Sequence, residues 1–445
     1  GSRVPVLEPS DSQEALTFVK RAFELSERFD VPVIVRMTTR VSHGKSLVEQ
    51  GERHDVAVRP YQRDVRKNVM LPGNARLRQR QVNARETELV AYGAAAEENR
   101  VEYRDTSLGV ITSGIAYQYV REGLPDASTL KLGLTVPLPD DLILEFASKV
   151  DRVVVIEELD PYLSLRVKAL GIPLVEHGLP RSGELSPRLV AEAFGSGALP
   201  GRDEVQGLPP RPPLLCPGCP HRGLFYSLGK IRAVVTGDIG CYTLASLAPL
   251  SGMDSCVCMG ASIGMAHGVD LAGSVERPIV AVIGDSTFAH SGITGLLHMA
   301  YAGSTGTVII LDNRTTAMTG HQGNPVNGVF IDGSAAPELD LEALSRAVGA
   351  VSVRIVDPHE LDATLAVLRE ETAAQRLSVI IAKAPCALLI KEAKDPYAID
   401  EELCTKCGAC IRLGCHAISR DDTGRAVIDT ATCVGCGQCV QVCRF

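Results

Sequence analysis

The sequence lacks any hydrophobic run that approaches the roughly twenty residues a helix needs to span a bilayer. It also lacks an excess of positive charge, because 53 acidic residues outnumber 45 basic ones and give a formal net charge of −8. We therefore expect neither a membrane nor a nucleic acid as the main partner. The chain does not begin with methionine, and we expect a processed or truncated piece of a longer protein.

Cysteine, by contrast, is plentiful. The chain has 14 cysteines, and their spacing is typical of metal ligands rather than of disulfides. Such usage indicates a reducing compartment in which thiolates stay available, so we expect a cytoplasmic protein. With 445 residues, 45% of them hydrophobic, the chain exceeds a single hydrophobic core, and we expect roughly three globular domains.

Eight cysteines lie in the last 42 residues, in two groups that each read C-x2-C-x2-C with a fourth cysteine shortly after. In bacterial two-cluster ferredoxins, the three closely spaced cysteines of such a run ligate one iron–sulfur cluster, and the fourth cysteine ligates the other cluster. The pattern predicts two [4Fe-4S] clusters, one held by Cys404, Cys407, Cys410 and Cys443, the other by Cys433, Cys436, Cys439 and Cys415. Structural disulfides or two zinc ribbons are the alternatives, although zinc ribbons keep their C-x2-C pairs apart.

Patterns along the chain predict an α/β protein with a connecting segment and a linker. A helix over 15–29 and a strand over 31–36 look like the end of an α/β domain. Residues 48–104 are rich in arginine, glutamine and asparagine, and we expect a surface segment ending in a helix near 86–98. An α/β unit over 105–194, a Gly/Pro-rich linker over 195–213 and a larger α/β domain over 214–394 should follow, with the cysteine module at 395–445.

Within the larger domain, residues 279–283 and 307–311 read as buried parallel strands, whose carboxyl ends would meet at one edge of a sheet. The carboxylate of Asp285, the amide of Asn313 and the backbone carbonyl of Thr315 suit Mg²⁺ bridging a diphosphate. Gly284 allows close backbone approach, and the helix that begins at Ser286 offers N–H donors to phosphate. An ordinary strand end is the alternative.

Five sequence segments occur in a fixed order: CPGCPHR (216–222), GDIGCYTL (237–244), CMGASIGMAHG (258–268), GDSTFAHSGITGL (284–296) and LDNRTTAMTGHQ (311–322). Together they resemble the thiamine-diphosphate-dependent 2-oxoacid:ferredoxin oxidoreductases, and within them the large subunits of the indolepyruvate ferredoxin oxidoreductase family. The GDS…DN pair is similar to the GDG…N motif of thiamine enzymes, with Ser286 in place of the second glycine. The resemblance covers essentially the entire chain.

The resemblance implies thiamine-diphosphate-binding parallel-sheet domains followed by an α+β two-cluster ferredoxin-like module. Residues 1–47 would be the tail of a pyrimidine-binding domain, 105–194 a domain like the C-terminal domain of transketolase, and 214–394 the diphosphate-binding domain. The implied reaction is oxidative decarboxylation of aryl-pyruvates such as indolepyruvate. Electrons would pass through the clusters to ferredoxin, and the acyl group to coenzyme A.

The resemblance also implies partners. By the resemblance, the glutamate that activates thiamine diphosphate belongs to the pyrimidine-binding domain, of which this sequence would retain only the tail. We expect it to come from an upstream segment or from another chain. A small beta subunit would complete the enzyme, as a heterotetramer.

Further residues take expected roles from the resemblance. Related enzymes hold a third, proximal [4Fe-4S] cluster near the thiazolium, and the matching positions are Cys216, Cys219, Cys241 and Cys386. Buried thiols kept for packing are the alternative there, and packing is what we expect of Cys256 and Cys258. His221 and His321 are the preferred acid–base pair, or else hydrogen-bonding residues behind the site. Met318 would support the bent cofactor or pack in the core, and Arg36 and Arg40 would form interface ion pairs or bind a carboxylate or coenzyme A phosphate.

Two other functions are compatible with the same sequence. The enzyme could act on a different 2-oxoacid, such as a branched-chain acid or phenylglyoxylate. The chain could also be an electron-transfer protein with α/β domains that serve only as scaffolding. Binding of thiamine diphosphate and Mg²⁺ separates this second alternative from the enzyme.

Overall fold

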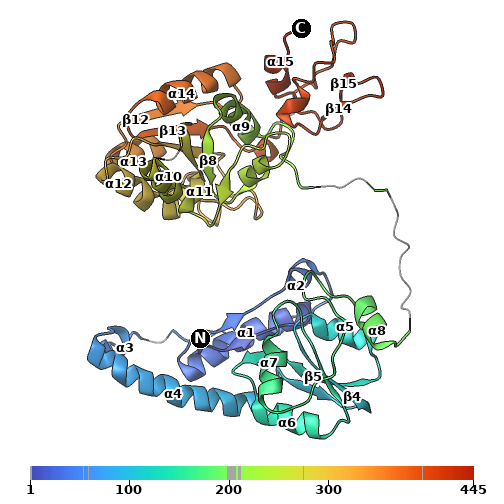
Figure 1. The fold of residues 1–445 in the computed structure, drawn as a ribbon. Coiled ribbons are helices and arrows are strands. Elements are labelled where there is room, and N and C mark those ends of the chain that lie inside the picture. Colours follow the sequence, from blue (N-terminus) through green and yellow to red (C-terminus); the bar gives the residue numbers. More distant parts are fainter. Residues whose placement is uncertain are drawn as a thin grey trace. The chain divides into compact units, whose positions relative to one another are not determined.

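The computed structural model describes residues 3–53, 55–58, 60–197, 207–208, 212–273, 275–392 and 394–445. It divides into two compact units, Gly1–Gly207 and Leu208–Phe445, which are described separately below (Figure 1). The division falls within the predicted linker, 195–213. Of that linker, residues 198–206 and 209–211 lie outside the described residues.

The first unit is built around a four-stranded sheet. Its strands, in spatial order, are β3 (Arg100–Glu102), β5 (Ala127–Leu132), β4 (Asp105–Ser113) and β7 (Val153–Ile156). All neighbours are parallel except β3, which is antiparallel to β5. Side chains alternate between the faces of a strand, so Ile111 packs with α6 (Asp140–Ser148) and α7 (Tyr162–Ala169), while Val110 packs with α5 (Ala116–Gly123) and α8 (Pro187–Phe194). The sequence did not predict the central strand β5.

The opening segment belongs to this same unit. β1 (Val6–Leu7) pairs in parallel with β2 (Ile34–Val35) and antiparallel with β6 (Leu134–Val136), so strands from 1–47 and 105–194 share one sheet. Between β1 and β2 runs α1 (Ser12–Phe29), which begins where the Asp11 carboxylate accepts a hydrogen bond from the Glu14 N–H. A short helix, α2 (Thr39–His43), follows β2.

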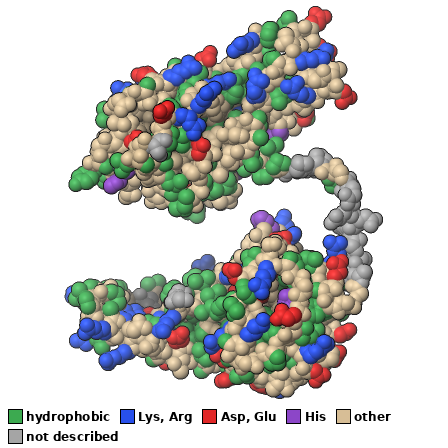
Figure 2. Space-filling view, viewed as in Figure 1, with side chains coloured by type: hydrophobic (Ala, Val, Ile, Leu, Met, Phe, Trp, Pro, Cys, Tyr) green, Lys and Arg blue, Asp and Glu red, His purple; other side chains and the backbone are tan. Residues whose placement is uncertain are grey.

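The helical part of the connecting segment is longer than predicted. α3 (Val65–Asn68) is followed by α4 (Pro72–Ala94), which begins with proline in its first turn. The prediction of a helix only near 86–98 was wrong because α4 has almost no apolar stripe and buries only Leu89 and Gly93. Figure 2 shows apolar and basic side chains together at the end of the unit where α3 lies.

The second unit contains a six-stranded, fully parallel sheet (Figure 1). Its strands, in spatial order, are β12 (Ser352–Val356), β13 (Ser378–Lys383), β11 (Thr307–Asp312), β10 (Ile279–Gly284), β8 (Val234–Gly237) and β9 (Ser255–Cys256). One face packs against α9 (Pro220–Ile231) and α14 (Leu361–Ala373), and the other against α10 (Ala261–Ala272), α12 (Ile293–Tyr301) and α13 (Leu341–Ala347). Because all strands are parallel, their carboxyl ends form one edge.

The last fifty residues form a small module with little regular structure. It contains η4 (Ile411–Leu413), an antiparallel hairpin of β14 (Ile418–Arg420) and β15 (Ala426–Ile428), and α15 (Gln438–Val442). The predicted fold class, parallel-sheet α/β domains with an α+β ferredoxin-like module, is confirmed. Among the described helices, none combines the length and the apolar character that a membrane crossing requires.

Candidate active site and cysteine-lined cavities

The ends of β10 and β11 form the candidate active site. These strands pair in parallel with Gly284 opposite Leu311, so the residues that follow them emerge side by side. A cavity of about 50 Å³ lies there, which we call the strand-end cavity. It is lined by all six predicted cofactor-binding residues: Gly284, Asp285, Ser286, Asn313, Thr315 and Met318. The topology thus brings together residues that are 28 positions apart in the sequence.

Asp285 has the electrostatics of a cation ligand. Its side chain is only 2% exposed, and Oδ1 accepts hydrogen bonds from the Ser286 N–H at 2.6 Å and from Asn324 Nδ2 at 3.3 Å. Among the described residues, Oδ2 has no hydrogen-bond partner. Burial raises the pKa of this carboxyl to about 7. A buried carboxylate oxygen without a partner is costly, and a metal cation at that oxygen would offset the cost.

The other groups at this edge fit a magnesium diphosphate. Asn313 is 8% exposed, and its Oδ1 accepts only a long hydrogen bond, 3.4 Å, from the Thr315 N–H. Carboxylate, amide and backbone oxygens are the ligands that Mg²⁺ prefers. α11 (Asp285–Thr287), the π-helical η2 (Phe288–Gly292) and α12 follow one another without a break, so a helix begins at the cavity. Helix N-termini favour phosphate.

Tyr242 holds the strand-end loop in place, a role the sequence did not indicate. The side chain is 4% exposed, its hydroxyl accepts a hydrogen bond from the Gly284 N–H at 3.0 Å, and it donates one to the Ile239 carbonyl at 3.1 Å. Its ring meets the His221 ring edge to face, with centroids 5.7 Å apart. Tyr242 therefore links the loop after β8 to the loop that carries Asp285.

We expect Tyr242→Phe to weaken this link without unfolding the protein. The Gly284 N–H would lose its acceptor, which should lower the free energy of unfolding by about 1–2 kcal/mol. Misplacement of the loop should also raise the dissociation constant of Mg²⁺–thiamine diphosphate several-fold. Urea unfolding and titration calorimetry measure the two effects, and an unchanged dissociation constant would show that Tyr242 is only a core residue.

The structure places the two predicted histidines in different surroundings. His221 lines the strand-end cavity and is 4% exposed, and burial lowers its pKa to about 4, so the ring is neutral at pH 7. His321 is not among the residues that line this cavity. It is exposed, has a left-handed backbone with φ of 62°, and its Nε2 lies 3.9 Å from Cys386 Sγ. The geometry thus places His221 at the cavity and His321 beside a cysteine.

Two expectations of packing are wrong. Cys256 and Cys258 are exposed, because β9 is the two-residue edge strand of its sheet and leaves one side of the chain open to solvent. Met318, for which core packing was the alternative, is 47% exposed while lining the strand-end cavity. An apolar side chain in that position is available to a ligand.

Cys216, Cys219, Cys241 and Cys386 lie near one another. Burial raises the pKa of the Cys241 thiol, with smaller contributions from Cys386 and Cys216. Cys219 is 7% exposed, and burial raises its pKa to about 12. Cys241 also lines the strand-end cavity, and the Cys386 N–H donates to the Asn313 carbonyl at 3.1 Å. This cysteine set therefore borders the candidate cofactor site directly.

The eight terminal cysteines line two cavities. The first cysteine cavity, about 200 Å³, is lined by Cys404, Cys407, Cys410 and Cys443, and Cys439 also reaches it. The second cysteine cavity, about 20 Å³, is lined by Cys415, Cys433, Cys436 and Cys439. The fourth cysteine of each run thus lies with the other run, the crossing that a two-cluster ferredoxin requires.

The structure contains no disulfide, because all fourteen cysteines, every one of them described, are free thiols. Within the described part of the chain, no three His, Cys, Asp or Glu side chains converge as a single metal ion would require. A [4Fe-4S] cluster does not need such convergence, because each of its cysteines ligates a different iron.

The second cysteine cavity touches the CPGC turn. Pro217, Gly218 and Arg222 are part of its lining. Gln438 Nε2 donates to the Cys219 carbonyl at 3.4 Å, and Gln441 Oε1 accepts from the Leu361 N–H at 2.9 Å, so α15 is attached to the parallel-sheet domain. The strand-end cavity, the CPGC cysteines and the terminal cavities are therefore contiguous.

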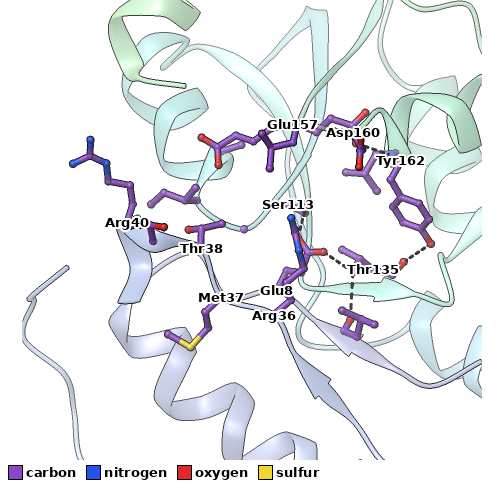
Figure 3. A pocket seen from close by; sticks show the side chains of 18 of the residues that line it. Glu8, Arg36, Met37, Thr38, Arg40, Ser113, Thr135, Glu157, Asp160 and Tyr162 are labelled. Carbon is purple, nitrogen blue, oxygen red and sulfur yellow. Dashed lines mark hydrogen bonds and ion pairs between the residues drawn. The ribbon is translucent and has the colours of Figure 1, made fainter. Parts of the chain in front are cut away.

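The first unit has a cavity of its own, of about 710 Å³ (Figure 3). Arg36 pairs with Glu8 at 3.0 Å, and Glu8 also accepts hydrogen bonds from Ser113 and Thr135 at 3.1 Å. Figure 3 shows Arg40 pointing away from this group, and it pairs with Glu184 at 2.8 Å. Both guanidinium groups thus have carboxylate partners within their own unit.

Two family models match the second unit. The thiamine pyrophosphate enzyme C-terminal TPP binding domain matches residues 238–382, which include the strand-end cavity residues Asp285 and Asn313. The 4Fe-4S binding domain matches residues 426–445, which contain four of the terminal cysteines.

The chain is similar to proteins named indolepyruvate oxidoreductase subunit IorA. The Methanothermobacter marburgensis protein is 38% identical over 99% of this chain and 76% of its own length. The Archaeoglobus fulgidus protein is 36% identical over 94% of this chain and 72% of its own. A solved 2-oxoglutarate:ferredoxin oxidoreductase from Magnetococcus marinus matches 41% of this chain and 70% of its own, at 16% identity and a TM-score of 0.36, too low to bear on function.

Proposed function

Because the chain belongs to the family of indolepyruvate oxidoreductase A subunits, we propose that it carries out thiamine-dependent oxidative decarboxylation of indolepyruvate and similar aryl-pyruvates. The 2-oxoacid loses CO₂, its acyl group passes to coenzyme A, and two electrons reduce two ferredoxin molecules by one electron each. The protein is an oxidoreductase, and its thiamine and iron–sulfur domains match this chemistry.

The residues of the strand-end cavity bind and orient the cofactor. Thiamine diphosphate, when bound, supplies the carbanion stabilisation that decarboxylation needs. Asp285 and Asn313, with the Thr315 carbonyl, would hold Mg²⁺, and the start of α11 would donate N–H groups to the diphosphate. Tyr242 fixes the loop, Met318 supports the cofactor from the exposed side, and neutral His221 is the nearest candidate for proton transfer.

The observation that favours an oxidoreductase over a plain decarboxylase is the continuity of the cysteines with this cavity. Cys241 lines the strand-end cavity, and Gly218 lines the second cysteine cavity. We propose a [4Fe-4S] cluster in each terminal cavity and a third on Cys216, Cys219, Cys241 and Cys386. Electrons would leave the cofactor site through the CPGC set, pass through the second cysteine cavity and the first, and reach ferredoxin.

A partner is part of the proposal. Among the described residues, none that lines the strand-end cavity is a glutamate, whereas thiamine enzymes of this kind use one at the pyrimidine ring. We propose that this glutamate comes from a pyrimidine-binding domain outside the sequence described and that a small beta subunit completes a heterotetramer. Fourteen free thiols suit the reducing cytoplasm.

We expect this chain alone to show little oxoacid-dependent reduction of ferredoxin, and the chain assembled with its partners to show full activity. The assay supplies coenzyme A and a panel of oxoacids, namely indolepyruvate, phenylpyruvate, phenylglyoxylate and a branched-chain acid. The highest kcat/KM on indolepyruvate would support the aryl-pyruvate proposal, and a clear preference for the branched-chain acid would replace it. Full activity of the unassisted chain would contradict the external glutamate.

A further inference from the structure

Arg222 is a buried cation without a carboxylate partner. It lies on α9, next to the CPGC turn, and is 2% exposed. Its Nη1 donates to the Leu413 carbonyl at 3.0 Å, and its Nη2 donates to the carbonyls of Leu215 at 2.7 Å and Cys216 at 3.0 Å. Within the described part of the chain, Nε has no partner, and no aspartate or glutamate oxygen lies within the 4.0 Å of an ion pair.

Such an arrangement needs an explanation because a buried charge is costly unless an opposite charge is near. Three neutral carbonyls satisfy hydrogen bonds, yet they leave the positive charge itself uncompensated. The groups that this guanidinium meets in the second cysteine cavity are the cysteine side chains expected to hold a cluster, and these side chains carry negative charge once they do so.

We propose that Arg222 is the fixed counter-charge of the cluster in the second cysteine cavity and that it raises the reduction potential of that cluster. A cluster with four thiolate ligands is anionic and gains one more negative charge on reduction, so a nearby cation stabilises the reduced form more than the oxidised form. One electron enters, the donor is oxidised by one electron, no bond forms or breaks, and no proton moves. This inference rests on the proposed iron–sulfur function.

Arg412 provides a matched control. Its Nη1 also donates to a carbonyl beside a cysteine, that of Cys407 at 3.2 Å, at the edge of the first cysteine cavity. Its side chain is exposed, however, and water screens its charge. Replacing either arginine by glutamine therefore removes the same charge, from an exposed position for Arg412 and from a buried position for Arg222.

The test uses the full chain, reconstituted anaerobically with iron and sulfide, in wild-type, Arg222→Gln, Arg222→Lys and Arg412→Gln forms. Iron and sulfide are measured first, and each cluster is then titrated potentiometrically with detection by electron paramagnetic resonance. A Cys415→Ser chain identifies the signal of the second cavity. For Arg222→Gln we expect about a tenfold loss in the one-electron reduction equilibrium of that cluster, or about 59 mV. Arg222→Lys and Arg412→Gln should stay within about threefold of wild type.

The outcomes separate charge from structure. An unshifted potential in iron-replete Arg222→Gln overturns the proposal, and so does a tenfold loss in Arg222→Lys, which keeps the charge. If Arg222→Gln binds less iron than wild type, the result for Arg222→Lys is decisive. An unchanged reduction potential in iron-replete Arg222→Lys supports the proposal, and a tenfold loss in its one-electron reduction equilibrium overturns it. Failure of the wild-type chain to bind any cluster would instead remove the proposed function, which the iron count reveals before any potential is measured.

Discussion

Asp285→Ala should abolish binding of Mg²⁺–thiamine diphosphate while leaving the iron content unchanged. The Asp285 carboxylate lies at the strand-end cavity with an unpartnered buried oxygen, and it is the only carboxylate among the described residues that line this cavity. Loss of a residue behind a metal ligand already costs about 10–100-fold in affinity, so removal of the ligand itself should cost at least about 100-fold. Titration calorimetry with thiamine diphosphate and Mg²⁺ measures the loss.

Asp332→Ala is the matched control, because Asp332 is an exposed carboxylate in the same unit whose hydrogen-bond partner is Ser334. It should leave cofactor affinity unchanged. Equal affinity of Asp285→Ala and wild type would show that the Gly-Asp segment is an ordinary strand end. Absence of cofactor binding in the wild-type chain and its assembly would favour the electron-transfer protein with scaffolding domains.

The second large effect concerns the terminal clusters. In the reconstituted chain, the terminal module should bind about eight iron atoms as two [4Fe-4S] clusters. Cys443→Ser should remove the cluster that it shares with Cys404, and Cys415→Ser the cluster that it shares with Cys433, because each fourth cysteine lines the other run's cavity. Iron and sulfide analysis should show a loss of about four irons in each variant.

The two variants can be told apart by their remaining spectra. If the runs did not cross, Cys415→Ser would damage the cluster of Cys404, and the spectrum that it leaves would match that of Cys404→Ser instead of Cys433→Ser. Cys256→Ser is the control, because Cys256 is an exposed cysteine outside all three sets. Iron beyond eight atoms that disappears in Cys216→Ser would establish the third cluster.

The sequence was informative wherever short spacing fixes geometry. The two cysteine runs predicted which terminal cysteines line each cavity, and the buried strands 279–283 and 307–311 became β10 and β11 within one residue of the predicted bounds. Both patterns are local in the sequence. The cysteine pattern reflects a tight turn that repeats, and the strand pattern reflects the uniform burial of a central parallel strand. Asp285 and Asn313 followed because parallel strands end at one edge.

The residues that the sequence did not indicate make their contacts with residues far away in the sequence. Tyr242 matters through Gly284, and Arg222 through Leu413, partners 42 and 191 residues away, so no local pattern reports them. Both lie in segments, GDIGCYTL and CPGCPHR, whose cysteines are the more recognisable part of the pattern. The pairing of His221 with His321 stays a prediction: His221 lines the strand-end cavity, and His321 has a left-handed backbone and lies beside Cys386.

The position of α9 bears on the path that electrons would take. A side-chain carbon added at Gly223 would lie 2.0 Å from the Pro358 carbonyl oxygen, and one added at Gly218 would lie 2.5 Å from Val434 Cγ2. The segment that carries Cys219 therefore approaches its neighbours closely at both ends, where a larger residue would clash. Gly218 thus lets the CPGC turn lie close to Val434 of the terminal module, and this shortens the path that electrons would cross.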